Sequence, residues 1–293
     1  MAGGLFIYAS AIVDFVASKQ HLPTARLDLI VRQQDADREI RGVDLLYTQI
    51  LQLAFQKVDL GEHVLYSRFR TVVGVMLLLF HPLSKKAFSN LLKTRGTPSQ
   101  ISTTLRFLHS LLNVPDSEDE PIRVLHKSFP DFLTDPTRCK DGRFFIDPPV
   151  QHEDILFSCL DLMRERLERN IYGLDDHVVL SEIEDLADLR ERCIGSSLEY
   201  ACRFWTKHLA SIPGDGPHAK QVQEAIDEFF VERLLPWIEV FIIMGHLGVA
   251  VYSINDIRQW YISVRYTRTH SYLAYPHTSP LGGHPNLQTG RRQ

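Results

Sequence analysis

The chain has 293 residues, of which 44% are hydrophobic; this content supports a packed core and excludes a disordered protein. The formal net charge of −4, from 32 basic and 36 acidic residues, provides no broad positive field and argues against nucleic-acid binding through the phosphate backbone. The four cysteines lie without the dense spacing of a disulfide framework, which favours a reducing compartment.

Two apolar stretches have some features of targeting or membrane segments. Residues 1–20 lack the basic start of a signal peptide, and Asp14 interrupts their apolar run. The longest apolar run, residues 240–252, contains His246 and is shorter than the roughly 20 residues that cross a bilayer. We therefore expect two core helices, no membrane association and a cytoplasmic protein.

Residues 1–60 are expected to form the end of a helical domain. Residues 5–18 fit a helix that is apolar nearly all round and needs neighbours on several sides. Pro23 ends this helix, and further helices are predicted at 24–34 and 43–57. The last of them carries an apolar stripe with the period of a helix, formed by Leu46, Ile50, Leu53 and Ala54.

Residues 61–148 show the element order of a winged-helix domain, which is three helices with tight turns and then an extended segment. The first helix ends in the apolar run VVGVMLLLF. Ser84 can cap the second helix, and Thr97 or Ser99 can cap the third, which is predicted at 97–112.

The extended segment of this domain is predicted to be a small β-hairpin. An acidic loop at 115–120 precedes the strand at 122–126, and residues 142–147 are the expected antiparallel partner. The first of these strands ends at His126.

Residues 149–265 return to helical periodicity and are expected to form an all-α array of paired helices, in which Pro236 ends or kinks one helix. Residues 266–293 lose this periodicity and collect Gly, Pro, Thr and His, which predicts a disordered tail. The predicted fold class is therefore mainly α, with one small β-hairpin.

The familiar motifs of catalysis and metal binding are missing from the sequence. There is no Gly-Lys pair, so the GxxxxGK[ST] loop that cradles phosphates cannot form, and no CxxC, HExxH or GxSxG pattern occurs. We therefore expect that this chain is not an enzyme, holds no metal ion or cofactor by itself, and acts through protein partners.

His126 is the candidate functional residue. As a structural residue, it would end the strand half-buried and hydrogen-bond a neighbouring carbonyl. As a functional residue, it would point out of the winged helix and donate to a phosphate on an adjacent domain. The sequence alone is compatible with both interpretations.

Two other functions fit parts of the chain. A winged helix suggests a DNA-binding regulator, but the recognition helix, 97–112, offers only Arg106 and His109 to bases or phosphates, which argues against nucleic acid as a partner. The helices at 149–265 also suit a stand-alone protein-interaction scaffold.

Five blocks of the sequence together resemble the C-terminal half of fungal NACHT-domain proteins. These are STAND-type nucleotide-switch NTPases, related to innate-immunity and vegetative-incompatibility receptors. The similarity extends from about residue 3 to about residue 262. The blocks are GGLFIYASAIVDFV, VDLLYTQILQLAF, FRTVVGVMLLLFHPLSKKAFSNLL, IRVLHKSFPDFLTDPTRC and LEYACRFWTKHL.

The resemblance implies a place for this chain in a larger signalling system. NACHT proteins carry a P-loop core that binds ATP or ADP, then a helical domain, a winged helix and a further helical domain, often followed by a WD-repeat sensor. This chain would begin inside the first helical domain, as a truncated gene model or a short paralogue. It would be a non-catalytic signalling fragment, with a NACHT core or a WD-repeat sensor as its expected partner.

The resemblance also implies site residues. His126 corresponds to the winged-helix histidine that contacts the β-phosphate of ADP and keeps the switch closed. Lys127 follows it, where the plant relatives have an acid, so the second half of this motif differs. Gly4, Leu5 and Phe6 correspond to a Gly-Leu-Pro motif beside the adenine, with Phe6 in place of the proline.

Overall fold

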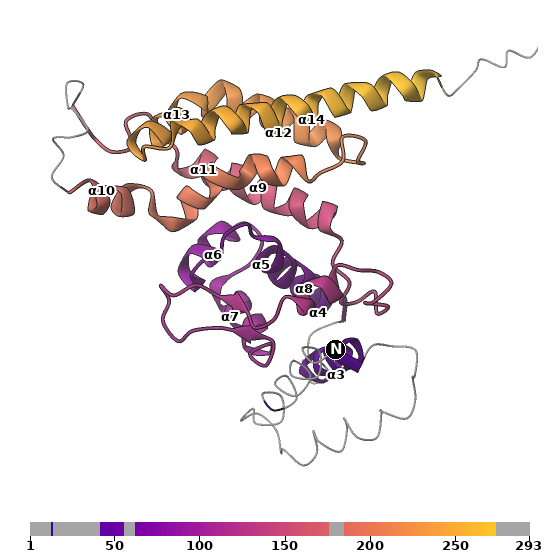
Figure 1. The fold of residues 1–293 in the computed structure, drawn as a ribbon. Coiled ribbons are helices and arrows are strands. Elements are labelled where there is room, and N and C mark those ends of the chain that lie inside the picture. The colour runs from indigo at the N-terminus through magenta and orange to yellow at the C-terminus, as the bar shows by residue number, and fades with distance from the viewer. Residues whose placement is uncertain (1–12, 14–41, 56–61, 176–184, 274–293) are drawn as a thin grey trace, which may run out of the picture.

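A computed structural model describes residues 13, 42–55, 62–175 and 185–273 (Figure 1). These residues are mainly α with one two-stranded sheet, which confirms the predicted fold class. Helix α3 (Gly42–Phe55) comes first in the described part of the chain. Residues 62–147 then form a compact part, which we call the hairpin unit. The described residues from 148 to 273 form a second part, which we call the helical array.

Helix α3 spans Gly42–Phe55 and lies against the hairpin unit. Leu46 and Ile50 of its predicted apolar stripe are buried, and the other two members are half-buried against the same core. The Phe55 ring meets the Phe69 ring edge-on, with centroids 5.2 Å apart. The burial of this face explains why the helical period was readable in the sequence.

The hairpin unit begins with one helical run that changes its hydrogen-bonding pattern midway. It consists of α4 (Glu62–Phe69), the π-helix η1 (Arg70–Gly74) and α5 (Val75–Leu78). A Cβ atom added to Gly74 would lie 2.4 Å from Oε1 of the buried Gln151 side chain. The glycine therefore allows the wide turn of η1 to pack closely on the helical array.

The next two helices begin at caps that the sequence predicted. Helix α6 (Lys85–Leu91) starts after Ser84, whose Oγ accepts a hydrogen bond from the Ala87 N–H at 3.2 Å. Helix α7 (Pro98–Arg106) starts after Thr97, which forms a reciprocal capping box with Gln100. Of the two caps proposed for α7, Thr97 is therefore correct, and the helix ends earlier than the predicted residue 112.

The hairpin pairs different residues from those expected. Strand β1 (Leu112–Asn113) pairs antiparallel with β2 (Arg123–Val124), so that Leu112 lies opposite Val124. The prediction that residues 142–147 are the partner strand was wrong. The Asp141 carbonyl accepts the N–H groups of Phe144 and Phe145 in a turn, and this turn buries Phe144 in the core.

The helical array contains six helices among its described residues. Helix α9 begins at Pro148, which together with Pro149 occupies the first turn, where a missing N–H costs no hydrogen bond. The helix break expected at Pro236 falls at Arg233 instead, because Pro236 lies inside the first turn of the following helix. The helices are α9 (Pro148–Arg166), α10 (Leu186–Cys193), α11 (Gly195–Ala210), α12 (Ala219–Glu232), α13 (Leu234–Ile243) and α14 (Leu247–Leu273).

Helix α14 also corrects one predicted boundary. A disordered tail was expected from residue 266, but the helix continues without a break to Leu273. Residues 274–293 of that predicted tail lie outside the described residues.

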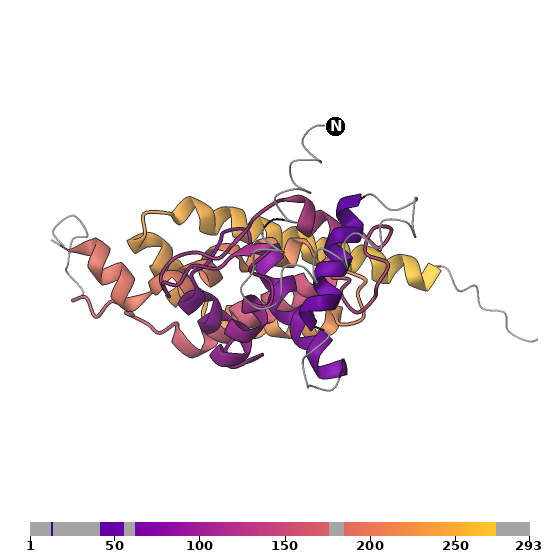
Figure 2. The same cartoon turned by 90° about the horizontal axis from the view of Figure 1, so that it is seen from below.

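The elements are stacked in layers (Figure 1). Helices α12, α13 and α14 form one layer, α9 and α11 lie beneath it, and the hairpin unit lies beneath those, with α3 at its far side. The view from below shows the hairpin unit lying across the helical array (Figure 2). Helix α11 touches both α6 and α14, so it joins the hairpin unit to the outer layer.

The core of the array is built around buried tryptophans and cysteines. The Trp237 indole N–H donates to the Cys202 carbonyl at 3.0 Å, and both side chains are fully buried. All four cysteines are free thiols, and Cys139, Cys159 and Cys202 are buried whereas Cys193 is half-buried.

Candidate functional site: the His126 junction

His126 lies between the hairpin and the short helix α8 (Ser128–Leu133). Its side chain is half-buried. The Ser128 backbone N–H donates to His126 Nδ1 at 3.0 Å, and Ser128 Oγ lies 2.8 Å from the same nitrogen. The expected bond to a neighbouring carbonyl is thus replaced by two bonds to the serine that opens α8.

These contacts define the tautomer of the imidazole. An N–H group can only donate, so Nδ1 accepts and the proton of the neutral ring sits on Nε2. Ser128 Oγ then donates its own hydrogen to Nδ1 and accepts from the Tyr47 hydroxyl, which lies 2.7 Å away. Tyr47, Ser128 and His126 therefore form a directed hydrogen-bond chain that leaves Nε2 as a donor.

Tyr47 connects this chain to helix α3. Its ring is buried, with centroids 5.2 Å from Phe129 and 5.5 Å from Phe132 of α8. Burial raises the pKa of Tyr47, which keeps the hydroxyl protonated and able to donate near neutral pH.

A second contact fixes α3 beside α8. The Asp44 carboxylate, whose residue is only 3% exposed, receives two hydrogen bonds from the Arg138 guanidinium, from Nη2 at 2.6 Å and from Nε at 3.0 Å. Such a two-point pair fixes direction as well as distance. His126 therefore lies at a junction whose two sides, α3 and the segment from Ser128 to Arg138, are held together.

A second polar cluster lies between the hairpin unit and the helical array. His208 is fully buried, its Nε2 lies 2.8 Å from the Tyr200 hydroxyl, and its Nδ1 lies 2.8 Å from Nδ1 of His152. The Phe80 N–H donates to the Tyr200 oxygen at 3.2 Å. With the Phe80 N–H on its oxygen, the Tyr200 hydroxyl can donate its own hydrogen to His208 Nε2, and the His208 Nδ1–H can then donate to His152.

Burial determines the charge state of these histidines. Loss of hydration lowers the pKa of His208 to about 3, with a further lowering from the neighbouring His152. Burial also lowers the pKa of His152. Both rings are accordingly neutral at physiological pH.

The remaining sequence-based candidates lie elsewhere. Gly4, Leu5 and Phe6 fall outside the described residues, so their adenine contact stays a prediction. Among the residues that the structure describes, no group of three His, Cys, Asp or Glu side chains is arranged to hold a metal ion. In the same part of the chain, no helix has the length and apolarity needed to cross a membrane.

Sequence reasoning missed Tyr47, Ser128, His152 and His208. A local signal was available for Ser128, because a serine two residues after a histidine at a helix start can hydrogen-bond the ring. No local signal marks the others, because their partners are distant in sequence.

Comparisons with protein-family models, curated proteins and solved structures found no match to this chain.

Proposed function

We propose that this chain is the non-catalytic, regulatory part of a NACHT-type nucleotide switch, and that His126 senses the phosphate of a nucleotide held by a P-loop domain. The observation that carries the proposal is the orientation of the imidazole. Ser128 occupies Nδ1 with two hydrogen bonds, so the half-buried ring offers Nε2–H to an outside acceptor. A phosphate oxygen is such an acceptor.

The junction gives this contact a route to the rest of the protein. Movement of His126 acts on Ser128 and, through it, on Tyr47 in α3. Because the Asp44–Arg138 pair holds the same helix, α3 and α8 are expected to respond as one body. Binding and loss of a diphosphate would then select between two domain arrangements.

The ligand, the partner and the compartment of such a switch follow from this role. ADP or ATP would be bound by the P-loop core, and this chain would supply the histidine and the helical surfaces that read it. The partner is a NACHT core, with a WD-repeat protein as the sensor. Both belong to cytoplasmic signalling in innate immunity or vegetative incompatibility.

The experiment uses the purified chain and a separately expressed P-loop core of a fungal NACHT protein, loaded with ADP or with a non-hydrolysable ATP analogue. We expect the complex to form with ADP and to lose its nucleotide preference in the His126→Ala variant. His81→Ala, which changes an exposed histidine elsewhere in the hairpin unit, is the control. In a full-length relative, the corresponding histidine-to-alanine change should produce constitutive signalling, and an unchanged resting state would remove the sensing role.

One observation favours a second candidate, a protein-interaction scaffold. Large apolar side chains are exposed on the outer layer of the array, with Val231 at 87%, Leu235 at 76% and Tyr252 at 77%. Large exposed apolar side chains on a folded protein can take part in protein binding. A complex that forms without nucleotide, survives His126→Ala and is lost in Leu235→Lys would favour the scaffold over the switch.

A further inference from the structure

A pocket of about 280 Å³ opens on the hairpin unit, away from the residues of the His126 junction. One wall is formed by α4 and the π-helix η1, and the other by the turn into α7. Its floor is apolar, because Val72, Leu92 and Ile101 are buried beneath it. Single π-helical turns inside α-helices frequently occur at functional sites.

Arg68, which lines this pocket, is unusual among the cations of the protein. Its side chain is half-buried, yet within the described residues its guanidinium makes no hydrogen bond and no ion pair. Every other half-buried arginine or lysine of the described chain has a hydrogen-bond acceptor. These residues are Arg70, Lys85, Arg138, Arg166, Arg190, Arg203 and Arg233.

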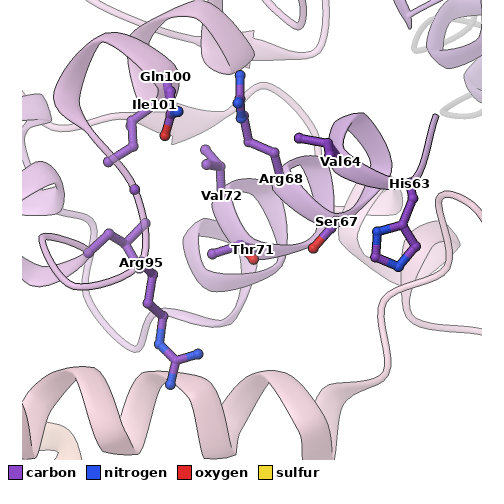
Figure 3. A pocket seen from close by; sticks show the side chains of 11 residues that line it. His63, Val64, Ser67, Arg68, Thr71, Val72, Arg95, Gln100 and Ile101 are labelled. Atoms are coloured by element: carbon purple, nitrogen blue, oxygen red, sulfur yellow. The ribbon is translucent and has the colours of Figure 1, made fainter. Parts of the chain in front are cut away.

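The pocket has a positive lining without a compensating acid. None of the described residues that line it is Asp or Glu. Arg95, the other arginine of the lining, is already paired with Asp154 of α9 at 2.5 Å. Figure 3 shows its guanidinium directed toward α9, whereas Arg68 and Gln100 extend to the opposite side. Arg68 is therefore the cation left to meet an incoming anion.

Gln100 offers a second donor beside Arg68. Its Oε1 accepts the Thr97 N–H at 3.1 Å in the capping box, which fixes the amide and leaves its N–H₂ group for another acceptor. The hydroxyl groups of Ser67 and Thr71 also line the pocket, on the side away from the Arg68 guanidinium in Figure 3. A phosphate has three terminal oxygens and can accept from the guanidinium and from the amide at the same time.

We infer that this pocket binds a compact phosphate monoester, with the phosphate on Arg68 and Gln100 and an apolar group on the floor. Its volume lies near the lower limit, about 300 Å³, of small-molecule sites, so the ligand is small. The inference is independent of the nucleotide sensing proposed for His126, which needs a separate P-loop domain.

The test is isothermal titration calorimetry of the full chain with phenyl phosphate as the probe. We expect saturable binding that weakens about tenfold or more in Arg68→Gln, because a charge-assisted hydrogen bond is lost. Arg106→Gln, which changes an exposed arginine at the end of α7, should bind as the wild type does. Equal affinity of Arg68→Gln and the wild type, or no binding by the wild type, would overturn the assignment.

A second variant guards against a folding defect. Gln100→Glu keeps the oxygen that completes the capping box but replaces the amide donor by a negative charge, so the fold should be retained and phenyl phosphate should be repelled. Unchanged binding in this variant would contradict the proposed phosphate position. Phenol binding as tightly as phenyl phosphate would refute the anion site, and inorganic phosphate binding as tightly would refute the apolar part.

Discussion

The Asp44 carboxylate and the Arg138 guanidinium, 94 positions apart in the sequence, form a two-point ion pair that ties α3 to the segment after α8. Asp44 is almost fully buried, and the Arg138 side chain is 18% exposed. Removing one member leaves the other charge partly buried and unpaired.

We predict that Asp44→Asn lowers the free energy of unfolding by about 3 kcal/mol, because the guanidinium loses its carboxylate. Urea denaturation of Asp44→Asn, Arg138→Gln and the double variant measures the coupling. The second substitution should cost under about 1 kcal/mol once the first has been made. Fully additive losses would show that the two side chains do not interact.

The tautomer of His126 gives a spectroscopic prediction. In ¹⁵N–¹H correlation spectra recorded at a pH where the ring is neutral, we expect the proton on Nε2, because Nδ1 accepts from Ser128. Ser128→Ala should remove the link to Tyr47 and destabilise the protein by about 1 kcal/mol. A ring protonated on Nδ1 in the wild type would contradict the hydrogen-bond directions assigned here.

The buried pair His152 and His208 predicts an acid-sensitive fold. Burial lowers the pKa of both histidines, and the pKa of His208 falls to about 3. A histidine in the unfolded chain has a pKa of about 6.5. Below pH 6.5 the unfolded chain therefore binds protons that the folded chain does not, so stability should fall between about pH 6.5 and about pH 3. At pH 5 the loss from His208 alone should be roughly 2 kcal/mol.

Urea midpoints measured from pH 8 to pH 5 test this prediction. The His208→Gln variant should show a weaker dependence on pH than the wild type, whatever its stability at pH 8. His246→Gln changes an exposed histidine and should keep the wild-type dependence. If all three proteins lose the same stability on acidification, the buried pair is not the cause.

Gly74 in the π-helix η1 provides a packing test. Gly74→Ala should destabilise the protein by about 1–3 kcal/mol, because the new methyl group would overlap the buried Gln151 side chain. Shortening the neighbour in Gly74→Ala/Gln151→Ala should recover part of that loss in thermal unfolding. Gly248→Ala in α14, where a methyl group meets nothing within 4 Å, should not destabilise the fold.

Local chemistry made part of this fold predictable. Ser84 and Thr97 were recognisable as helix caps because their side chains bond backbone groups only three residues away. The inward face of α3 was recognisable because Leu46 and Ile50 repeat with the helical period. Signals of this kind need no knowledge of the rest of the chain.

Tertiary contacts decided what the sequence did not show. Leu105, Leu108 and Leu112 fit a continuing helix, yet the chain leaves α7 at Arg106, and Leu112 pairs with Val124 instead. All three leucines are buried in the structure, as a continuing helix facing the core would also require, so hydrophobicity could not separate the alternatives.

In the candidate site, too, the local sequence indicated one residue, whereas its contacts depend on the tertiary structure. His126 was singled out by its place after a strand, but its contact with Tyr47 runs through Ser128, 81 residues from that tyrosine. The pairing of His152 with His208 spans 56 residues and depends on how α9 packs against α11. Spacing within either helix gives no indication of such a contact.

The buried free thiols described above become reactive toward an alkylating reagent only when the part of the protein that holds them unfolds. Burial raises the pKa of Cys139 to about 12 and raises those of Cys159 and Cys202 as well, so the native side chains lack both the thiolate and the access that an alkylating reagent requires. Cys139 belongs to the hairpin unit, and the other two belong to the helical array. The order in which a reagent modifies them would tell whether these two parts unfold together or separately.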